Sequence, residues 1–168
     1  MLRIIKPALV LLAVVSVVSC ISTRKYEEEE QSIIDQYVAE NNITAEPDAH
    51  GIYYIPLAAG TGDLIEEGDS VGVYYTMKFL NDTTVYSNLK EDEPMRFKLG
   101  SVGLIEGWNV GLKYMRGGGK AQFIIPSKMA YGPMGFGYYD LYDRYITVIP
   151  GYTPLFYEIE IVEHKKEE

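Results

Sequence analysis

The part of the chain that follows residue 51 is built mainly of short segments in which apolar and polar side chains alternate, and this pattern constrains the fold more than any other feature. Alternation with a period of two, in segments rich in Val, Ile, Tyr and Phe, is typical of β-strands with one buried face. Glycine-containing turns such as Gly60-Thr61-Gly62 separate the segments. We therefore expect strands over residues 52–55, 71–80, 95–99, 120–125 and 155–162.

Only one segment in this β-rich part has helical spacing. Trp108, Leu112 and Met115 fall on one face of a short helix over about residues 105–115. Several strands with one short helix predict an α+β domain in which an antiparallel β-sheet is wrapped around that central helix.

A second, N-terminal helix is expected over about residues 26–41. Ile33, Ile34, Tyr37 and Val38 recur at the spacing of a single apolar stripe. A helix of this length needs a surface to pack against, which is either its own domain or another subunit. The acidic run over residues 27–30 is expected to be solvated, as a tether or the start of the helix.

The first residues of the chain have the layout of a secretory leader. Arg3 and Lys6 are followed by an apolar run over residues 7–18, which is shorter than the roughly 20 residues that a membrane-spanning helix needs. The single cysteine, Cys20, comes directly after Val17-Val18-Ser19, and this segment resembles a bacterial lipobox. The resemblance implies that Cys20 is lipidated and becomes the mature N-terminus. The alternative is an ordinary signal peptide followed by a chance cysteine.

A lipoprotein leader predicts a protein of the cell envelope of a Gram-negative bacterium, anchored to a membrane by lipid. Ile21 rather than Asp follows the cysteine, so the outer membrane is favoured, on its periplasmic or surface face. The expected organisation is a signal peptide over 1–19, a tether with the N-terminal helix over 20–50, the folded domain over 51–164 and a charged tail over 165–168.

Charge and composition exclude several classes of function. The net charge of −9 argues against a nucleic-acid partner, because phosphate binding needs a basic surface. One cysteine rules out an internal disulfide and argues against a cysteine-based metal site. His50 and His164 are far apart and have polar neighbours, so both are expected to be solvated. No metal or cofactor is predicted.

Six segments between residues 51 and 163 resemble, in order and near the right spacing, motifs of the FKBP-type peptidyl-prolyl isomerase family. For example, Gly68–Thr76 is similar to G-D-x-V-x-V-x-Y-T, and Leu104–Leu112 is similar to V-I-x-G-W-x-x-G-L. The other four segments are Phe97–Gly100, Met115–Ala121, Ile124–Gly132 and Ile149–Ile161. The resemblance implies an FKBP-like fold that isomerises X-Pro bonds in proline-containing segments of exported proteins.

The resemblance also implies the roles of individual residues. Trp108 would form the floor under the proline ring, while the Ile105 N–H and the Tyr131 hydroxyl would donate to substrate carbonyls. Ile149 would close the rim. Together with Ile105 and Ile149, the expected substrate-binding residues are Tyr75, Val85, Tyr86, Met95, Phe97, Leu104 and Tyr157. Each of these aromatic residues, taken alone, is equally typical of plain core packing.

The physical requirements of this reaction fit such a set. Rotating an X-Pro amide means overcoming a barrier of about 18–20 kcal/mol. An apolar, water-poor site favours the twisted amide, which is less charge-separated than the planar one, and donors aimed at the displaced carbonyl add to this.

The chain departs from the family pattern on one side of the site. Val85-Tyr86-Ser87 stands where the family has F-D-S, so the carboxylate is missing, and Met77 and Met95 replace a glycine and a phenylalanine. With a longer turn, Tyr86 would stand at the family's Phe and Ser87 at its acidic residue, and both alignments remain open. Weak isomerase activity and poor binding of the macrolide tacrolimus are the expected consequences.

The segment over residues 133–147 is longer than in the minimal family domain and rich in tyrosine. It is interpreted either as a binding flap or as a packed loop with its own small core. Three hypotheses for the protein follow: an envelope prolyl isomerase, an FKBP-like module that binds peptides or ligands with little turnover, and a structural part of an envelope assembly.

Overall fold

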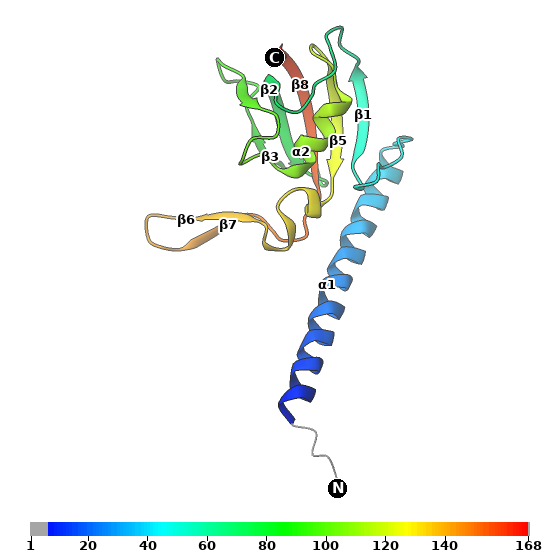
Figure 1. Cartoon of the computed structure of the whole chain (residues 1–168), viewed down its shortest axis with the longest axis vertical. Coiled ribbons are helices and arrows are strands. Elements are labelled where there is room, and N and C mark those ends of the chain that lie inside the picture. Colours follow the sequence, from blue (N-terminus) through cyan, green and yellow to red (C-terminus); the bar gives the residue numbers. More distant parts are fainter. Residues whose placement is uncertain (1–6, 168) are drawn as a thin grey trace.

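The computed structural model describes residues 7–167, and it describes side chains from Thr23 onward (Figure 1). The helices are α1 (Pro7–Glu40) and α2 (Glu106–Gly111), with short 3₁₀ turns η1 (Leu112–Tyr114), η2 (Ser127–Met129) and η3 (Gly132–Met134). The strands are β1 (Tyr53–Ala58), β2 (Ser70–Phe79), β3 (Thr84–Ser87), β4 (Met95–Lys98), β5 (Lys120–Ile125), β6 (Phe136–Tyr139), β7 (Tyr145–Ile149) and β8 (Leu155–Lys165).

An antiparallel sheet in the order β1-β5-β8-β2-β3, with β4 also paired to β2, forms the body of the domain. The long strands β2 and β8 lie at its centre and pair from Ser70↔Lys165 to Phe79↔Leu155. The expected α+β class, the five expected strands and the short central helix are confirmed. Three strands were not anticipated: β3, which is short and polar, and the separate hairpin β6–β7.

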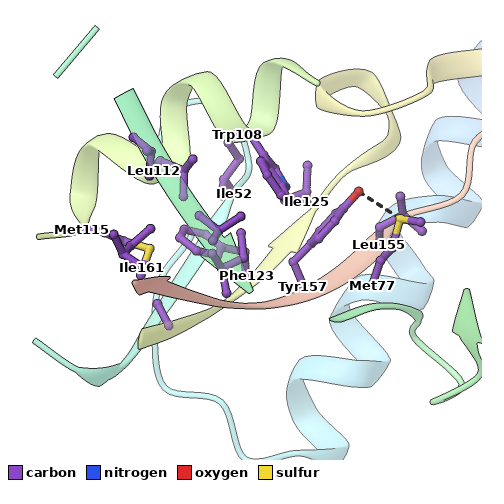
Figure 2. Close-up of a cluster of buried hydrophobic side chains, with 14 of the residues drawn as sticks. Ile52, Met77, Trp108, Leu112, Met115, Phe123, Ile125, Leu155, Tyr157 and Ile161 are labelled. Atoms are coloured by element: carbon purple, nitrogen blue, oxygen red, sulfur yellow. Dashed lines mark hydrogen bonds between the residues drawn. The ribbon is translucent and has the colours of Figure 1, made fainter. Parts of the chain in front are cut away.

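The core lies between the curved sheet and α2 (Figure 2). Leu112, Phe123 and Val73 are fully buried there. The helix approaches β5 closely because it carries glycine on the facing side: a Cβ on Gly107 would stand 2.5 Å from the Ile125 side chain. A Cβ on Gly111 would likewise stand 2.9 Å from the Phe123 ring. Both glycines are therefore required by packing.

The N-terminal helix docks on the opposite, outer face of the sheet. Ile34 packs with Tyr53, Ile124 and Phe156 in a second buried cluster. Of the two alternatives for this helix, packing on its own domain is the one that the structure shows. The apolar stripe is narrower than expected, because Ile33 is 48% exposed.

Two expectations for the N-terminal region need correction. The helix begins at Pro7 and not near residue 26, since it continues without a break from the apolar leader. Glu30, expected to be solvated with the rest of its acidic run, is only 7% exposed. The basic start of the leader and the side chain of Cys20 lie outside the described part. Where side chains are described, no helix carries an apolar stretch that would suffice to cross a membrane.

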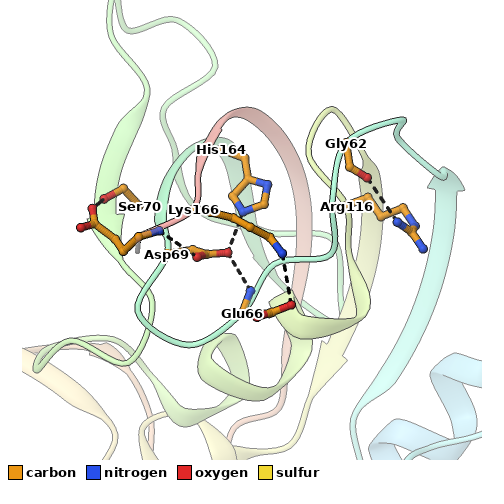
Figure 3. Close-up of polar contacts among 8 residues, drawn as sticks. Gly62, Glu66, Asp69, Ser70, Arg116, His164 and Lys166 are labelled. Carbon is orange, nitrogen blue, oxygen red and sulfur yellow. Dashed lines mark hydrogen bonds and ion pairs between the residues drawn. The ribbon is translucent and has the colours of Figure 1, made fainter.

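His50 is exposed, but the expectation that His164 is solvated is wrong. The His164 Nε2 lies 2.7 Å from Asp69 Oδ2, and both side chains are less than a tenth exposed (Figure 3). The backbone N–H of Glu66 also donates to this carboxylate at 2.9 Å. Asp69, in the turn before β2, therefore ties that turn to the end of β8. Burial alone would raise the pKa of Asp69, but the hydrogen bonds that it accepts outweigh burial and hold its pKa below the usual value.

We predict that Asp69→Asn lowers the free energy of unfolding by about 2 kcal/mol near neutral pH, because the buried charge-assisted hydrogen bonds are lost. A depressed pKa in the folded state stabilises the fold above the unfolded-state pKa, and this stabilisation is lost as pH falls through the folded pKa. The difference from wild type should therefore narrow between pH 4 and pH 2. Urea unfolding across this range measures it, with the exposed Asp92→Asn as the control. Equal stabilities at neutral pH, or a difference that persists at pH 2, would contradict the prediction.

Candidate active site

An aromatic cluster surrounds Trp108 at the start of α2. The Tyr75 ring meets the indole edge-on at 4.9 Å between centroids, and the Tyr157 ring does so at 5.6 Å. Phe97 lies 5.5 Å from it. Tyr75 lies on β2, Tyr157 on β8 and Phe97 on β4, so rings from three separate strands converge on a single indole of α2 that is 4% exposed.

The indole N–H of Trp108 lies in apolar surroundings. Trp108 Nε1 is buried, and none of the described residues offers it a hydrogen-bond acceptor. Buried donors without partners are rare in folded proteins and are costly. The surroundings of the indole therefore resemble the apolar, water-poor medium that would favour a twisted amide.

Three tyrosine hydroxyls lie at this cluster, and all are neutral at physiological pH. Burial, followed by the neighbouring Tyr86, Tyr131 and Glu91, raises the pKa of Tyr75 to about 12. Burial also raises the pKa of Tyr131, although its contact with the Tyr157 hydroxyl acts in the opposite direction. The pKa of Tyr157 is raised well above its usual value, mainly by burial. Neutral hydroxyls keep their protons and can donate hydrogen bonds.

Other residues expected at the floor and rim differ in their burial. Leu104, Ile105 and Tyr131 are half-buried and pack against the core beside Trp108. Ile105 has an extended backbone immediately before α2, where backbone N–H groups have no partner inside a helix. Ile149, expected at the rim, is instead completely buried in the core, as an inward-facing residue of β7.

On the altered side of the site, Val85 and Tyr86 take different positions. Val85 packs against the core, whereas the Tyr86 ring lies on the surface 5.4 Å from Tyr75. Tyr86 therefore contacts the aromatic cluster through Tyr75, whereas Val85 contacts the buried core. A bulge between Met77 and Lys78 shifts the pairing of β2 with β3 and makes room for this arrangement. Met95, also expected to bind substrate, is exposed to solvent.

Two polar residues at this edge were missed from the sequence. Glu91 accepts a hydrogen bond of 2.7 Å from the Tyr86 hydroxyl, so a carboxylate does lie here although the expected segment lacks one. Asn88 is buried, accepts from the Tyr75 N–H at 2.7 Å and donates to the Val73 carbonyl at 3.1 Å. It thereby fixes the backbone of β2 next to the Tyr75 ring. Neither residue matches a motif, and the only signal was the position of both in a polar loop.

The tyrosine-rich segment forms the two-stranded hairpin β6–β7, which projects from the body of the domain (Figure 1). The Phe136 ring lies 5.5 Å from Tyr131, so the hairpin starts at the edge of the aromatic cluster. Its large side chains are exposed, which differs from a packed loop with its own core. These residues are Met134, Phe136, Tyr138, Tyr139, Leu141, Tyr142, Tyr145 and Ile146.

The hairpin nevertheless has a defined tip. The Asp140 carboxylate accepts hydrogen bonds of 2.9 Å from the backbone N–H groups of Tyr142 and Arg144. The Arg144 side chain also pairs with Asp140 at 2.7 Å.

Among the described residues, no three His, Cys, Asp or Glu side chains gather closely enough to hold a metal ion.

Comparison with known proteins identifies the family to which the chain is similar. A family model described as FKBP-type peptidyl-prolyl cis-trans isomerase matches residues 62–162, which include α2 and every strand from β2 to β7. A probable FKBP-type peptidyl-prolyl cis-trans isomerase of Haemophilus influenzae is 34% identical over 67% of this chain and 42% of its own length. FkpA of Buchnera aphidicola is 32% identical over 67% of this chain and 40% of its own length. This chain thus spans less than half of either relative.

A shorter relative and two solved structures resemble the chain over more of their own length. The FK506-binding protein of Neisseria meningitidis is 33% identical over 67% of this chain and 95% of its own length. A crystal structure of a peptidyl-prolyl cis-trans isomerase from Pseudomonas syringae superposes with a TM-score of 0.69 at 26% identity, over 86% of this chain and 96% of that one. FkpA from Escherichia coli gives a TM-score of 0.64 at 23% identity, over 98% of this chain and 74% of that one, which supports the fold alone.

Proposed function

The chain belongs to the family of FKBP-type peptidyl-prolyl cis-trans isomerases, and on this premise we propose that it accelerates the cis-trans isomerisation of X-Pro bonds in exported polypeptides. The observation that carries the proposal is the aromatic cluster around Trp108, whose buried indole has apolar surroundings. Uncatalysed X-Pro isomerisation takes about 10–100 s and limits folding, so such a catalyst has a clear use.

The proposed mechanism requires no nucleophile, metal or cofactor. A proline ring bound against the Trp108 indole would place its amide in surroundings of low polarity. The planar amide is stabilised by charge separation, which this environment disfavours, so the twisted transition state is favoured by comparison. The Tyr131 hydroxyl and the Ile105 N–H would act as donors to substrate carbonyls, and the raised pKa of Tyr131 keeps its proton in place.

We predict that Tyr131→Phe lowers kcat/KM for a short X-Pro peptide about 2–10-fold, because one hydrogen bond is worth about 0.5–1.5 kcal/mol. Trp108→Phe should lower it further, since the smaller ring leaves the floor incomplete. Protease-coupled or NMR exchange measurements give the rates, and urea unfolding confirms that the variants are folded. Tyr74→Phe, on the other face of β2, is the matched control. A folded wild-type chain with no rate above background would rule out the enzyme and leave a binding module.

The projecting hairpin supports peptide binding beyond the proline. Large apolar side chains exposed together are typical of interaction surfaces, and an isolated two-stranded hairpin gains little stability from displaying them. Because Phe136 contacts Tyr131, a polypeptide held at Trp108 could continue along the hairpin. We therefore propose that the hairpin is a flap that holds unfolded segments of the substrate. The alternative function, binding with little turnover, would use the same surface.

We predict that the double variant Tyr138→Ser/Tyr142→Ser leaves kcat/KM for a tetrapeptide within twofold of wild type. It should lower kcat/KM about fivefold or more for a refolding protein limited by an X-Pro bond, since buried aromatic contacts are worth about 1 kcal/mol or more each. Leu57→Ser, which changes an exposed apolar residue on β1, is the control. Equal losses on both substrates, or none on either, would exclude the flap.

We also propose that the protein is a lipoprotein of the Gram-negative cell envelope, held at the outer membrane through Cys20. The support is in the sequence, where the only cysteine directly follows the apolar run of the leader. An N-terminal diacylglycerol with a further N-acyl chain would give stable anchoring, which a single chain does not. Substrates would then be exported chains that pass the membrane surface.

We predict that Cys20→Ser moves the full chain from the membrane fraction to the soluble or precursor fraction of a Gram-negative host. The wild-type chain should incorporate labelled fatty acid, and the variant should not. Ser19→Ala is the control, because it keeps a small residue before the cysteine. An unlabelled wild-type chain that fractionates with soluble proteins would contradict lipid attachment.

A further inference from the structure

Glu30 is a buried carboxylate that the proposed mechanism does not use. It is 7% exposed, while the other members of its acidic run, Glu27, Glu28 and Glu29, face solvent. Both of its oxygens accept hydrogen bonds from one residue: Oε1 from the Ser127 N–H at 2.5 Å and Oε2 from the Ser127 hydroxyl at 2.6 Å. These bonds join α1 to a point 97 residues further along the chain.

Ser127 is the first residue of the segment that leads to Tyr131. It follows β5 after Pro126 and is itself buried. A bond of 2.8 Å from the Ala130 N–H to the Ser127 carbonyl and one of 2.9 Å from the Met129 N–H to the Pro126 carbonyl make this segment a tight turn. Fixing Ser127 therefore fixes the backbone next to Tyr131.

A second contact of α1 leads to the part of the chain just after Tyr131. The Tyr26 ring stacks on Tyr152 at 5.0 Å and 16°. The Tyr152 N–H in turn donates to the Gly132 carbonyl at 3.0 Å. Tyr152 has a left-handed backbone at φ 55°, which is unfavourable for a residue with a side chain and is held by these neighbours. The helix thus contacts Ser127 directly and is linked through Tyr152 to Gly132, on the two sides of Tyr131 in sequence.

Docking of the helix does not by itself require Glu30. Ile34, Tyr37 and Val38 already attach α1 to the outer face of the sheet. An apolar residue at position 30 would serve that purpose better, because burying a carboxylate is unfavourable unless its hydrogen bonds are complete. Among the described residues, the bonds that Glu30 makes go to the turn that leads to Tyr131.

We propose that Glu30 is a positioning residue of the isomerase site, which holds Ser127 and thereby sets the Tyr131 hydroxyl over the Trp108 floor. This inference rests on the proposed isomerase function. It makes α1 part of the working unit of the enzyme, so that displacing the helix from the domain would lower activity without altering any residue that contacts substrate.

The test compares three variants of the full chain, Glu30→Ala, Glu30→Gln and Ile34→Ala, by kcat and KM on a tetrapeptide. Glu30→Ala should lower kcat/KM about fivefold. Glu30→Gln should recover most of this loss, because its amide can still bond both groups of Ser127. Ile34→Ala, which weakens docking through the apolar cluster, should lower the melting temperature yet leave kcat/KM within twofold at temperatures where it is folded. Glu29→Ala, exposed and adjacent, is the surface control.

A double-variant cycle tests the route of the effect. In a Tyr131→Phe background, Glu30→Ala should lower kcat/KM little further, since both changes act on the same hydrogen-bond donor. Full additivity, or equal kcat/KM for wild type and Glu30→Ala, would overturn the proposal.

Amide hydrogen exchange gives a readout that does not depend on catalysis. Residues 128–135 should exchange at least fivefold faster in Glu30→Ala, with no such change in Ile34→Ala. If the wild-type chain proves inactive but this difference is found, the isomerase proposal fails while the positioning of the turn stands. Unchanged exchange in Glu30→Ala would overturn the positioning role itself.

Discussion

The close packing of α2 against β5 is the constraint on which the rest of the structure depends. Glycine at positions 107 and 111 lets the helix backbone approach the Ile125 and Phe123 side chains without a clash. A six-stranded sheet can then curve around a helix only two turns long. Trp108, lying between the two glycines, is brought into contact with rings from three strands. The same packing that closes the core therefore builds the floor of the proposed site.

Local patterns in the sequence predicted most of the strands and the central helix. Alternation identified β2, β5 and β8 within a few residues, and the spacing of Trp108, Leu112 and Met115 identified the central helix with the turn that follows it. The placement of Tyr75, Phe97 and Tyr157 around the indole followed from the family motifs, and the ring contacts agree with it. β3 was not predicted because it has only four residues, of which Val85 packs against the core, and this is too short to show alternation.

The features that could not be predicted depend on partners distant in sequence. His164 and Glu30 both stand among polar residues, which is typical of solvated side chains, yet each is buried by a partner about a hundred residues away. The Glu91 carboxylate reaches the site through Tyr86, a link that no motif describes. The sequence of the tyrosine-rich segment fitted either a flap or a packed loop. In the structure β6 pairs with β7, and the large side chains of this hairpin are exposed to solvent.

The order of the strands also determines when this protein can fold. β8 is the last element of the chain, yet it lies between β5 and β2 at the centre of the sheet. Its pairing with β2, from Ser70↔Lys165 to Phe79↔Leu155, joins residues at opposite ends of the domain sequence. Exported N-terminus first, as proposed, the chain cannot complete its core until β8 has emerged. Such non-local pairing slows folding, typically to about milliseconds or seconds, so a protein proposed to hasten the folding of others must itself wait for its own final strand.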